Sequence, residues 1–113
     1  AGIGERGISM DPDSDDAGVC HVGVVNSARG LAFALSYPKN QLPRFANWQH
    51  FGPRGSYVTG LEPFYGSLHH APGDDSPTLA VDESRTYDLT LRILRTPDEI
   101  ATLTRHDGPV TRV

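Results

Sequence analysis

The amino-acid sequence predicts an all-β fold, an antiparallel β-sandwich with one short C-terminal helix. Three observations lead to this prediction. Short segments in which apolar and polar residues alternate recur along the chain, turn-forming glycine, proline and asparagine residues separate them, and only one segment carries the signals of a helix start. About seven short strands against one small helix are typical of a two-layered β domain.

A single domain is expected, because 113 residues can bury one core but not two. Residues 1–18 are rich in Gly, Asp and Ser and offer little that could be buried, so they are expected to form a flexible N-terminal arm. Residues 19–113 are expected to form the β-sandwich domain.

The first two strands are predicted to form a hairpin. The segments "VCHVGVVN" and "LAFALSY" flank a turn at residues 26–30 that contains both asparagine and glycine. One face of the second strand carries large residues, whereas the other carries small ones that permit a second layer or a ligand to approach closely. The large residues are Leu31, Phe33, Leu35 and Tyr37, and the small ones are Ala32, Ala34 and Ser36.

Further strands are predicted along the rest of the chain. Residues 43–51 are rich in aromatic side chains, and residues 57–62 form a strand-like segment that Pro63 terminates. A short strand is expected at residues 78–81. In residues 87–94 apolar and polar side chains alternate, which predicts one buried and one solvated face.

The single predicted helix begins at a capping box. Thr96 is the expected N-cap, Pro97 occupies the first helical position, and Glu99 occupies the third. Ile100 and Leu103 then form the inward stripe of the helix.

Composition excludes several classes of function. The 10 basic residues are scattered among 14 acidic ones and the formal net charge is −4, which argues against nucleic-acid binding because phosphate contacts need clustered Lys and Arg. No segment approaches the ~18 apolar residues of a membrane span. The single cysteine, Cys20, cannot form an internal disulfide, so a cytoplasmic setting is expected.

No metal site is expected. His69 and His70 are adjacent in a loop at residues 66–77, and adjacent side chains in an extended chain point to opposite sides. The acidic run at residues 11–16 lacks the glycine and distal glutamate of an EF-hand loop, so it is interpreted as a solvated face.

Glu62 is the candidate catalytic residue. It lies at a predicted strand end and shares a face with Gly60, where the missing side chain leaves a gap beside the carboxylate. A carboxylate in such a position is suited to proton abstraction. The alternative is an ordinary strand-end glutamate paired with Arg44 or Arg54.

Four neighbouring residues are candidates for substrate binding. Trp48 and Tyr65 offer flat aromatic faces that can pack on the C–H face of a sugar ring, although aromatic residues in small β domains usually belong to the core. Gln49 and His50 can supply hydrogen bonds to hydroxyl groups.

The chain resembles the C-terminal part of the galactose mutarotase-like (aldose 1-epimerase) superfamily. The resemblance rests on "LAFALSYPKNQLPRFANWQHFG", on "YVTGLEPFYG", and on "DESRTYDLTLRIL" followed by a short helix. It implies that the domain is part of a larger supersandwich. It also implies that Glu62 matches the catalytic base of the family, which removes the proton of the anomeric hydroxyl while a histidine acid protonates the ring oxygen, with no metal or organic cofactor.

The chain departs from that family in length and in its histidines. Family members are more than twice as long, and their acid histidine lies in the N-terminal half. None of the histidines here lies in the acid motif; they are His21, His50, His69, His70 and His106. The chain is therefore expected to be a fragment, a short relative that binds without catalysis, or a subunit completed by another copy.

Three functional hypotheses follow. The first is a carbohydrate-active domain that interconverts the anomers of a monosaccharide or sugar phosphate. The second is a non-catalytic carbohydrate-binding or assembly module, and the third is a structural β-sandwich. Exposed sheet edges and apolar surface in a half sandwich would favour self-association.

Overall fold

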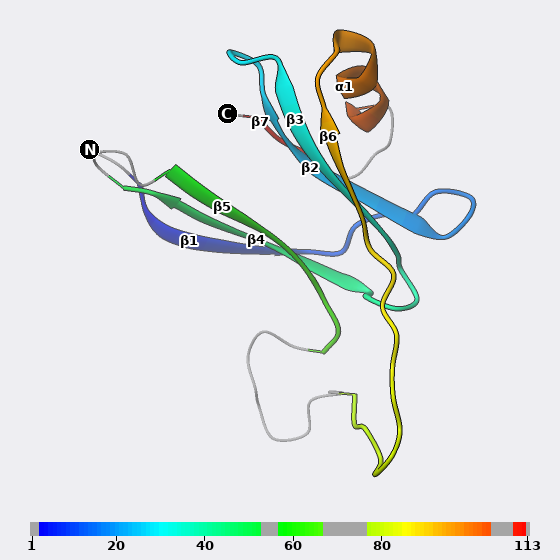
Figure 1. The fold of residues 1–113 in the computed structure, drawn as a ribbon. Helices are drawn as coiled ribbons and strands as arrows, with labels where there is room; N and C mark the ends of the chain where they lie inside the picture. The colour runs from blue at the N-terminus through cyan, green and yellow to red at the C-terminus, as the bar shows by residue number, and fades with distance from the viewer. Residues whose placement is uncertain (1–2, 53–56, 67–76, 105–109, 113) are drawn as a thin grey trace.

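The computed structural model describes residues 3–52, 57–66, 77–104 and 110–112. Two β-sheets pack face to face, and they diverge from one end of the molecule (Figure 1). The three-stranded sheet has the order β1-β4-β5, and the four-stranded sheet has the order β6-β3-β2-β7. The elements are β1 (Ile3–Met10), β2 (Val19–Asn26), β3 (Leu31–Pro38), β4 (Arg44–Phe51), β5 (Tyr57–Phe64), β6 (Thr90–Leu94), α1 (Pro97–Thr104) and β7 (Val110–Arg112).

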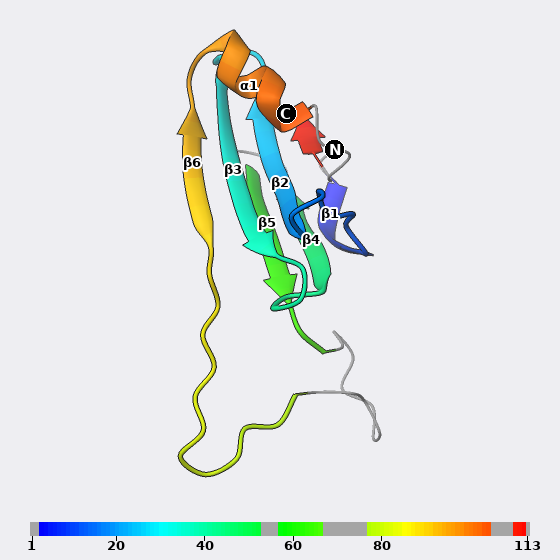
Figure 2. The ribbon, with the colours of Figure 1, turned by 90° about the vertical axis from the view of Figure 1, so that its right-hand side faces the viewer.

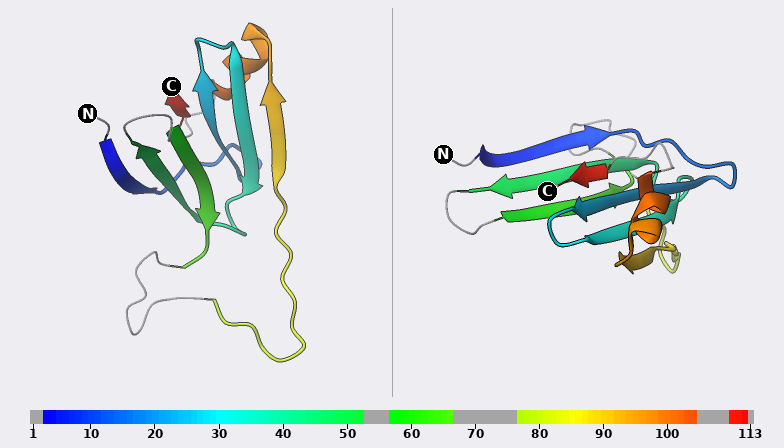
Figure 3. Two further views of the ribbon diagram at one scale, coloured as in Figure 1. Left: turned by 60° about the vertical axis from the view of Figure 1, so that its left-hand side comes forward. Right: turned by 90° about the horizontal axis from the view of Figure 1, so that it is seen from above.

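The predicted all-β sandwich with one short helix is confirmed. Neighbouring strands are antiparallel except for β2 and β7, which pair in parallel. Figure 3 shows the two sheets as separate layers, with α1 on the outer side of the larger one. Within the described ranges, no helix has the length and apolar character needed to cross a membrane.

The β2–β3 hairpin forms as the sequence predicts. Its turn is closed by Asn26, whose side-chain oxygen accepts a hydrogen bond from the Arg29 amide at 3.1 Å. Gly30 adopts a positive φ of 60°, a conformation that glycine enters without steric cost. The register then aligns the whole hairpin from Val19 opposite Pro38 to Asn26 opposite Leu31.

The main core lies between the two sheets. Alternate residues of β2 and β3 point toward the smaller sheet, where they meet Phe45 of β4. Its buried members are Cys20, Val22, Leu35, Tyr37, Leu42 and Phe45, with Met10, Phe33 and Leu61 packed around them. Burial raises the pKa of the Tyr37 phenol, so this group stays protonated in the core.

A second core lies on the outer face of the larger sheet. It consists of Val25, Ala32, Ala34, Leu94 and Leu103, with Ile100 packed against it. The small side chains of β3 let α1 approach the sheet closely, as the sequence predicts for this face. Gly23 permits the same approach, because a Cβ there would lie 2.5 Å from Leu103 Cδ2 and 2.7 Å from the carbonyl oxygen of Phe33.

The predicted capping box is present at the start of α1. The Glu99 amide donates to Thr96 Oγ1 at 3.2 Å, and the Glu99 carboxylate accepts from the amides of Arg95 and Thr96 at 2.8 and 3.1 Å. These backbone hydrogen bonds lower the pKa of the Glu99 carboxyl group.

The expectation of a flexible arm over residues 1–18 is wrong for Ile3–Met10, which forms β1 and pairs with β4 along its length. Its composition resembles that of a loop, but its backbone pairs with β4, a contact between segments that are far apart in the sequence. The sequence also alternates, so that Met10 reaches the core while Ser9 lies on the opposite face.

Two predictions for the later part of the chain are also corrected. Residues 78–81 form no strand, and the strand expected at residues 87–94 begins only at Thr90. The face of residues 87–94 that was expected to be buried is exposed, because the smaller sheet ends at β5 and none of the described strands lies opposite β6 (Figure 2).

We expect Gly23→Ala to lower the free energy of unfolding by about 1–3 kcal/mol, because the added methyl group overpacks the contact between α1 and the sheet. Urea denaturation measures this change. Gly7→Ala is the matched control, since a Cβ at Gly7 meets nothing within 4 Å. Equal stability of the two variants would contradict the close packing of α1.

Candidate functional site

The outer face of the three-stranded sheet carries the candidate catalytic residue. Residues directly opposite one another on neighbouring strands have their side chains on the same face. The register of β4 and β5 places Ala46 opposite Glu62, Trp48 opposite Gly60 and His50 opposite Val58. Phe45 and Leu61 occupy the alternate positions and pack into the core, so Glu62, Trp48 and His50 share the side that faces solvent.

Glu62 is exposed, and its carboxylate lies along its own strand over Gly60. A Cβ at Gly60 would lie 2.6 Å from Glu62 Oε1. The gap that the sequence predicts beside the carboxylate therefore exists, and in this structure the carboxylate occupies it. Gly60 thus determines where the carboxylate rests.

Glu62 is not paired with an arginine in the part of the chain that the structure describes. The ion pairs in that part are His21–Asp15, Lys39–Asp11 and Arg85–Glu83. Arg44 lies on the same face two residues before Ala46, but it forms no ion pair with Glu62. Arg54, the other partner considered from the sequence, lies outside the described residues.

Trp48 is half-buried and is held by a hydrogen bond to β1. Its indole Nε1 donates to Glu5 Oε1 at 2.7 Å. The His50 ring lies beside it, with the two ring centroids 6.2 Å apart and the planes inclined by 36°. Gly7 and Gly60 are the cross-strand neighbours of Trp48, so no side chain from either adjacent strand covers its position in the ladder.

Gln49 belongs to the opposite face, which corrects its grouping with Trp48 and His50. Adjacent strand residues point to opposite sides, and Gln49 Nε2 donates to Asn47 Oδ1 on the inner side of the sheet. Buried Asn47 in turn donates to Thr59 Oγ1 at 2.8 Å and to the Gly60 carbonyl oxygen at 2.9 Å. Gln49 and Asn47 therefore support β5 from within, beneath Gly60 and Glu62.

Tyr65 follows β5 and is exposed. The guanidinium carbon of Arg85 lies 5.9 Å from the centre of its ring, a cation–π distance. The structure therefore pairs Tyr65 with Arg85 and does not bring it against Trp48. His69, His70 and His106 lie outside the described residues.

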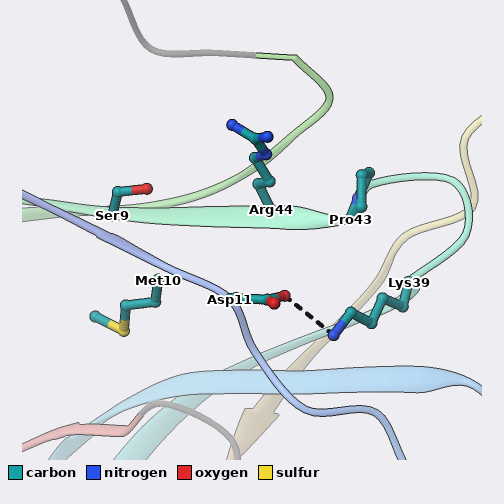
Figure 4. A pocket seen from close by; sticks show the side chains of 6 residues that line it. All are labelled: Ser9, Met10, Asp11, Lys39, Pro43 and Arg44. Atoms are coloured by element: carbon teal, nitrogen blue, oxygen red, sulfur yellow. Dashed lines mark ion pairs between the residues drawn. The ribbon is translucent and has the colours of Figure 1, made fainter. Parts of the chain in front are cut away.

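A hollow adjoins this face at the end where the two sheets meet. It encloses about 560 Å³ and is lined by Ser9, Met10, Asp11, Lys39, Pro43 and Arg44 (Figure 4). Figure 4 shows Ser9 and Arg44 on one side of the β4 ribbon and Met10 on the other. Glu62 does not line this hollow, but Ser9 lies in the same cross-strand row, opposite Ala46.

Lys39 joins two of the chain crossings between the sheets, those after β1 and β3. Its ammonium group lies 3.0 Å from Asp11 Oδ1 and donates to the Pro12 carbonyl oxygen at 2.8 Å. Lys39 follows β3, whereas Asp11 and Pro12 follow β1, so one side chain ties both connections together. Figure 4 shows this ion pair at the edge of the hollow.

A second polar cluster, which the sequence reasoning missed, lies on the outer face of the larger sheet. His21 Nε2 is 2.8 Å from Asp15 Oδ2, and His21 Nδ1 is 2.9 Å from Ser36 Oγ. His21 and Ser36 are cross-strand partners, and Asp15 lies in the loop that precedes β2. The predicted β2–β3 hairpin could have revealed the contact between His21 and Ser36, because its register places these two residues opposite one another.

The geometry of this cluster favours a structural role over that of a hydrolase triad. In the triad the serine faces Nε2 and the carboxylate faces Nδ1, which is the reverse of the arrangement here. Ser36 also lies in mid-strand between His21 and Thr90, whereas the nucleophile of an α/β-hydrolase is raised on a sharp turn. Asp15 Oδ1 accepts the Ala17 and Val19 amides at 2.9 Å each, so the cluster fastens the loop to β2.

The described residues contain no group of three or more His, Cys, Asp or Glu side chains that could hold a metal ion.

Comparison with known proteins identifies the family. Residues 1–93 match the family described as "Domain of unknown function (DUF4432)". This match covers most of the chain, and the chain belongs to that family. No curated protein and no solved structure matches the chain.

The Asp15 cluster predicts a dependence of stability on acid. The hydrogen bond from His21, together with that from the Val19 amide, lowers the pKa of Asp15 below its ordinary value of 3.8. A carboxyl group whose folded pKa is lowered stabilises the fold fully above its unfolded pKa, and this stabilisation is lost as the pH falls through the folded pKa. Asp15→Asn should therefore be less stable than the parent at pH 6, and the difference should narrow as the pH falls below 3.8.

Thermal unfolding between pH 2 and pH 7 measures this difference. Asp16→Asn is the control, because Asp16 is an exposed neighbour in the same loop. If the difference in melting temperature between Asp15→Asn and the parent is the same at every pH in this range, the role given to Asp15 is wrong.

Proposed function

We propose that this chain is a carbohydrate-active domain of the aldose 1-epimerase type, in which Glu62 acts as general base on a sugar that packs against Trp48. The observation that carries the proposal is the shared, solvent-facing side of Glu62 and Trp48 with glycine between them. The resemblance of "YVTGLEPFYG" to the mutarotase superfamily supports the same assignment.

The spacing of the two side chains suits one sugar ring. Trp48 and Glu62 lie in adjacent same-face rows of the sheet, and two residues along a strand span about 7 Å. A pyranose ring stacked on the indole would extend toward Glu62 across Gly60, into the space that the Glu62 carboxylate occupies in this structure. Arg44, exposed one row beyond Glu62 on the same face, supplies a cation for a phosphorylated sugar.

The chemistry assigned to Glu62 is proton removal from the anomeric hydroxyl. The C1–OH proton passes to the carboxylate, the C1–O bond of the ring breaks, and the ring oxygen takes a proton from an acid. Rotation of the open-chain aldehyde and reclosure from its other face return both protons and invert C1. The carboxylate must leave its position over Gly60 to reach the hydroxyl, a movement that an exposed side chain makes readily.

His50 is not well placed to be that acid. It lies four residues along the strand from the row of Glu62, a separation of about 13 Å, whereas C1 and the ring oxygen are bonded to each other. His50 is therefore assigned to hydrogen bonding with a sugar hydroxyl beyond Trp48. The acid is assigned to no residue of this chain.

The lack of an acid among Glu62, Trp48 and His50 makes sugar binding without turnover the second candidate function. In that case Glu62 accepts a hydrogen bond from a hydroxyl group and Trp48 supplies most of the contact area. Titration calorimetry with hexoses and hexose phosphates then shows saturable binding that Trp48→Ala abolishes, while the anomer ratio relaxes at the uncatalysed rate.

We expect Glu62→Gln to lower the rate of anomer interconversion by roughly 100-fold or more, because the amide cannot accept the hydroxyl proton. Polarimetry of freshly dissolved α-hexoses and their phosphates measures this rate. Glu83→Gln is the control, since Glu83 is an exposed carboxylate whose partner is Arg85. Equal rates for Glu62→Gln and the parent would remove the enzymatic proposal.

A further inference from the structure

Strand β6 and the segment before it expose an apolar face that is continuous with the main core. Tyr87, Leu89, Leu91 and Ile93 are 41%, 45%, 62% and 57% exposed. Leu91 pairs with Leu35 and Ile93 pairs with Phe33, so these side chains lie on the same side as the core between the sheets. Such a row at a sheet edge is typical of an interaction surface.

The backbone of this segment also has an open edge. Strand β6 is the outermost strand of its sheet, with β3 as its only neighbour among the described residues. Gln41, in the turn after β3, binds Asp88 twice: the Asp88 amide donates to Gln41 Oε1 at 2.7 Å, and Gln41 Nε2 donates to Asp88 Oδ2 at 2.8 Å. Because alternate residues direct their N–H and C=O groups to opposite sides, residues 87, 89, 91 and 93 direct theirs away from β3.

We propose that a second copy of this chain pairs with this edge, antiparallel, about a two-fold axis at Thr90. In this register Asp88 lies opposite the partner's Arg92, and Arg92 lies opposite the partner's Asp88. Leu89 meets the partner's Leu91, and Tyr87 meets the partner's Ile93. The two Thr90 side chains face one another, which is a favourable cross-strand pair.

The charge pattern selects this register over its neighbours. An axis at Arg92 would place two Arg92 side chains opposite one another, which is destabilising. An axis at Leu91 would place Asp88 opposite the partner's Leu94, which already packs beneath α1. Only the axis at Thr90 gives each Asp88 an arginine on the polar face while keeping the leucines together on the apolar face.

The pairing also accounts for the segment before β6. From β6, residues 83–89 run away from the body as an extended segment that ends at a turn around residues 80–83 (Figures 1 and 2). In the dimer, residues 86–89 lie along the partner's β6, and the two four-stranded sheets join into one. At the ends of this register Arg85 approaches the partner's Arg95. Glu83 Oε1 lies 3.8 Å from Arg85 Nε, which offsets part of the charge of Arg85.

Two cysteine variants test the axis directly. A non-hydrogen-bonded antiparallel pair has Cα atoms about 4.5 Å apart, within the range that a disulfide spans. Thr90→Cys should therefore give a disulfide-linked dimer on mild oxidation of the full chain, whereas Leu91→Cys should give far less. The native Cys20 is buried in the core and should not react. A cross-link mainly through Leu91→Cys would overturn the proposed axis.

A charge exchange tests the partner independently. Sedimentation equilibrium should show a dimer for the parent and a dissociation constant at least tenfold weaker for Arg92→Glu, because its glutamate would face the partner's Asp88. Adding Asp88→Arg to Arg92→Glu should restore the dimer. Arg29→Glu, in the β2–β3 turn, should leave the dimer unchanged.

A parent chain that stays monomeric at several hundred micromolar would overturn the proposal. A monomer whose Thr90→Cys thiol resists alkylation would also overturn it, since the edge would then be covered from within the same chain.

Discussion

Strand β3 is covered on both of its faces. Its large side chains pack on one face and its small side chains on the other. Leu35 and Tyr37 fill the space between the sheets, where distance to the next layer allows large groups. Ala32 and Ala34 face α1, whose close approach permits only small ones. Because β3 also pairs with β2 on one side and β6 on the other, an error in its register would exchange the two faces and disrupt both cores.

Much of the fold could be predicted because these patterns are local. The hairpin of β2 and β3, the capping box at Thr96 and the strand that ends near Glu62 each carry their signal within a few residues. Strand β1 does not. Its glycines and charges resemble those of a loop, and Ile3–Met10 is a strand through its pairing with β4, which lies more than 30 residues away in the sequence.

The site was predictable to a similar extent. Glu62 and Trp48 lie on the same face because cross-strand pairing joins them, and Gly60 provides the predicted gap. Gln49 was grouped with them by proximity along the chain, although a strand sends adjacent side chains to opposite faces. Asp15, His21 and Ser36 come from three different segments, so no contiguous sequence motif predicts their cluster.

The connections between the two sheets that the structure describes lie at one end. The chain crosses between the sheets after β1, after β3 and again after β5, and Lys39 links the first two crossings through Asp11 and Pro12. The sheets diverge toward the other end (Figure 1), so any rocking of one sheet over the other would pivot near Lys39. Ala46 and Glu62 lie close to this pivot, whereas Trp48 and His50 lie progressively farther from it. A ligand bound to this face would thus contact one strand position near the pivot and one that can shift, which would let the same face accept rings of different size.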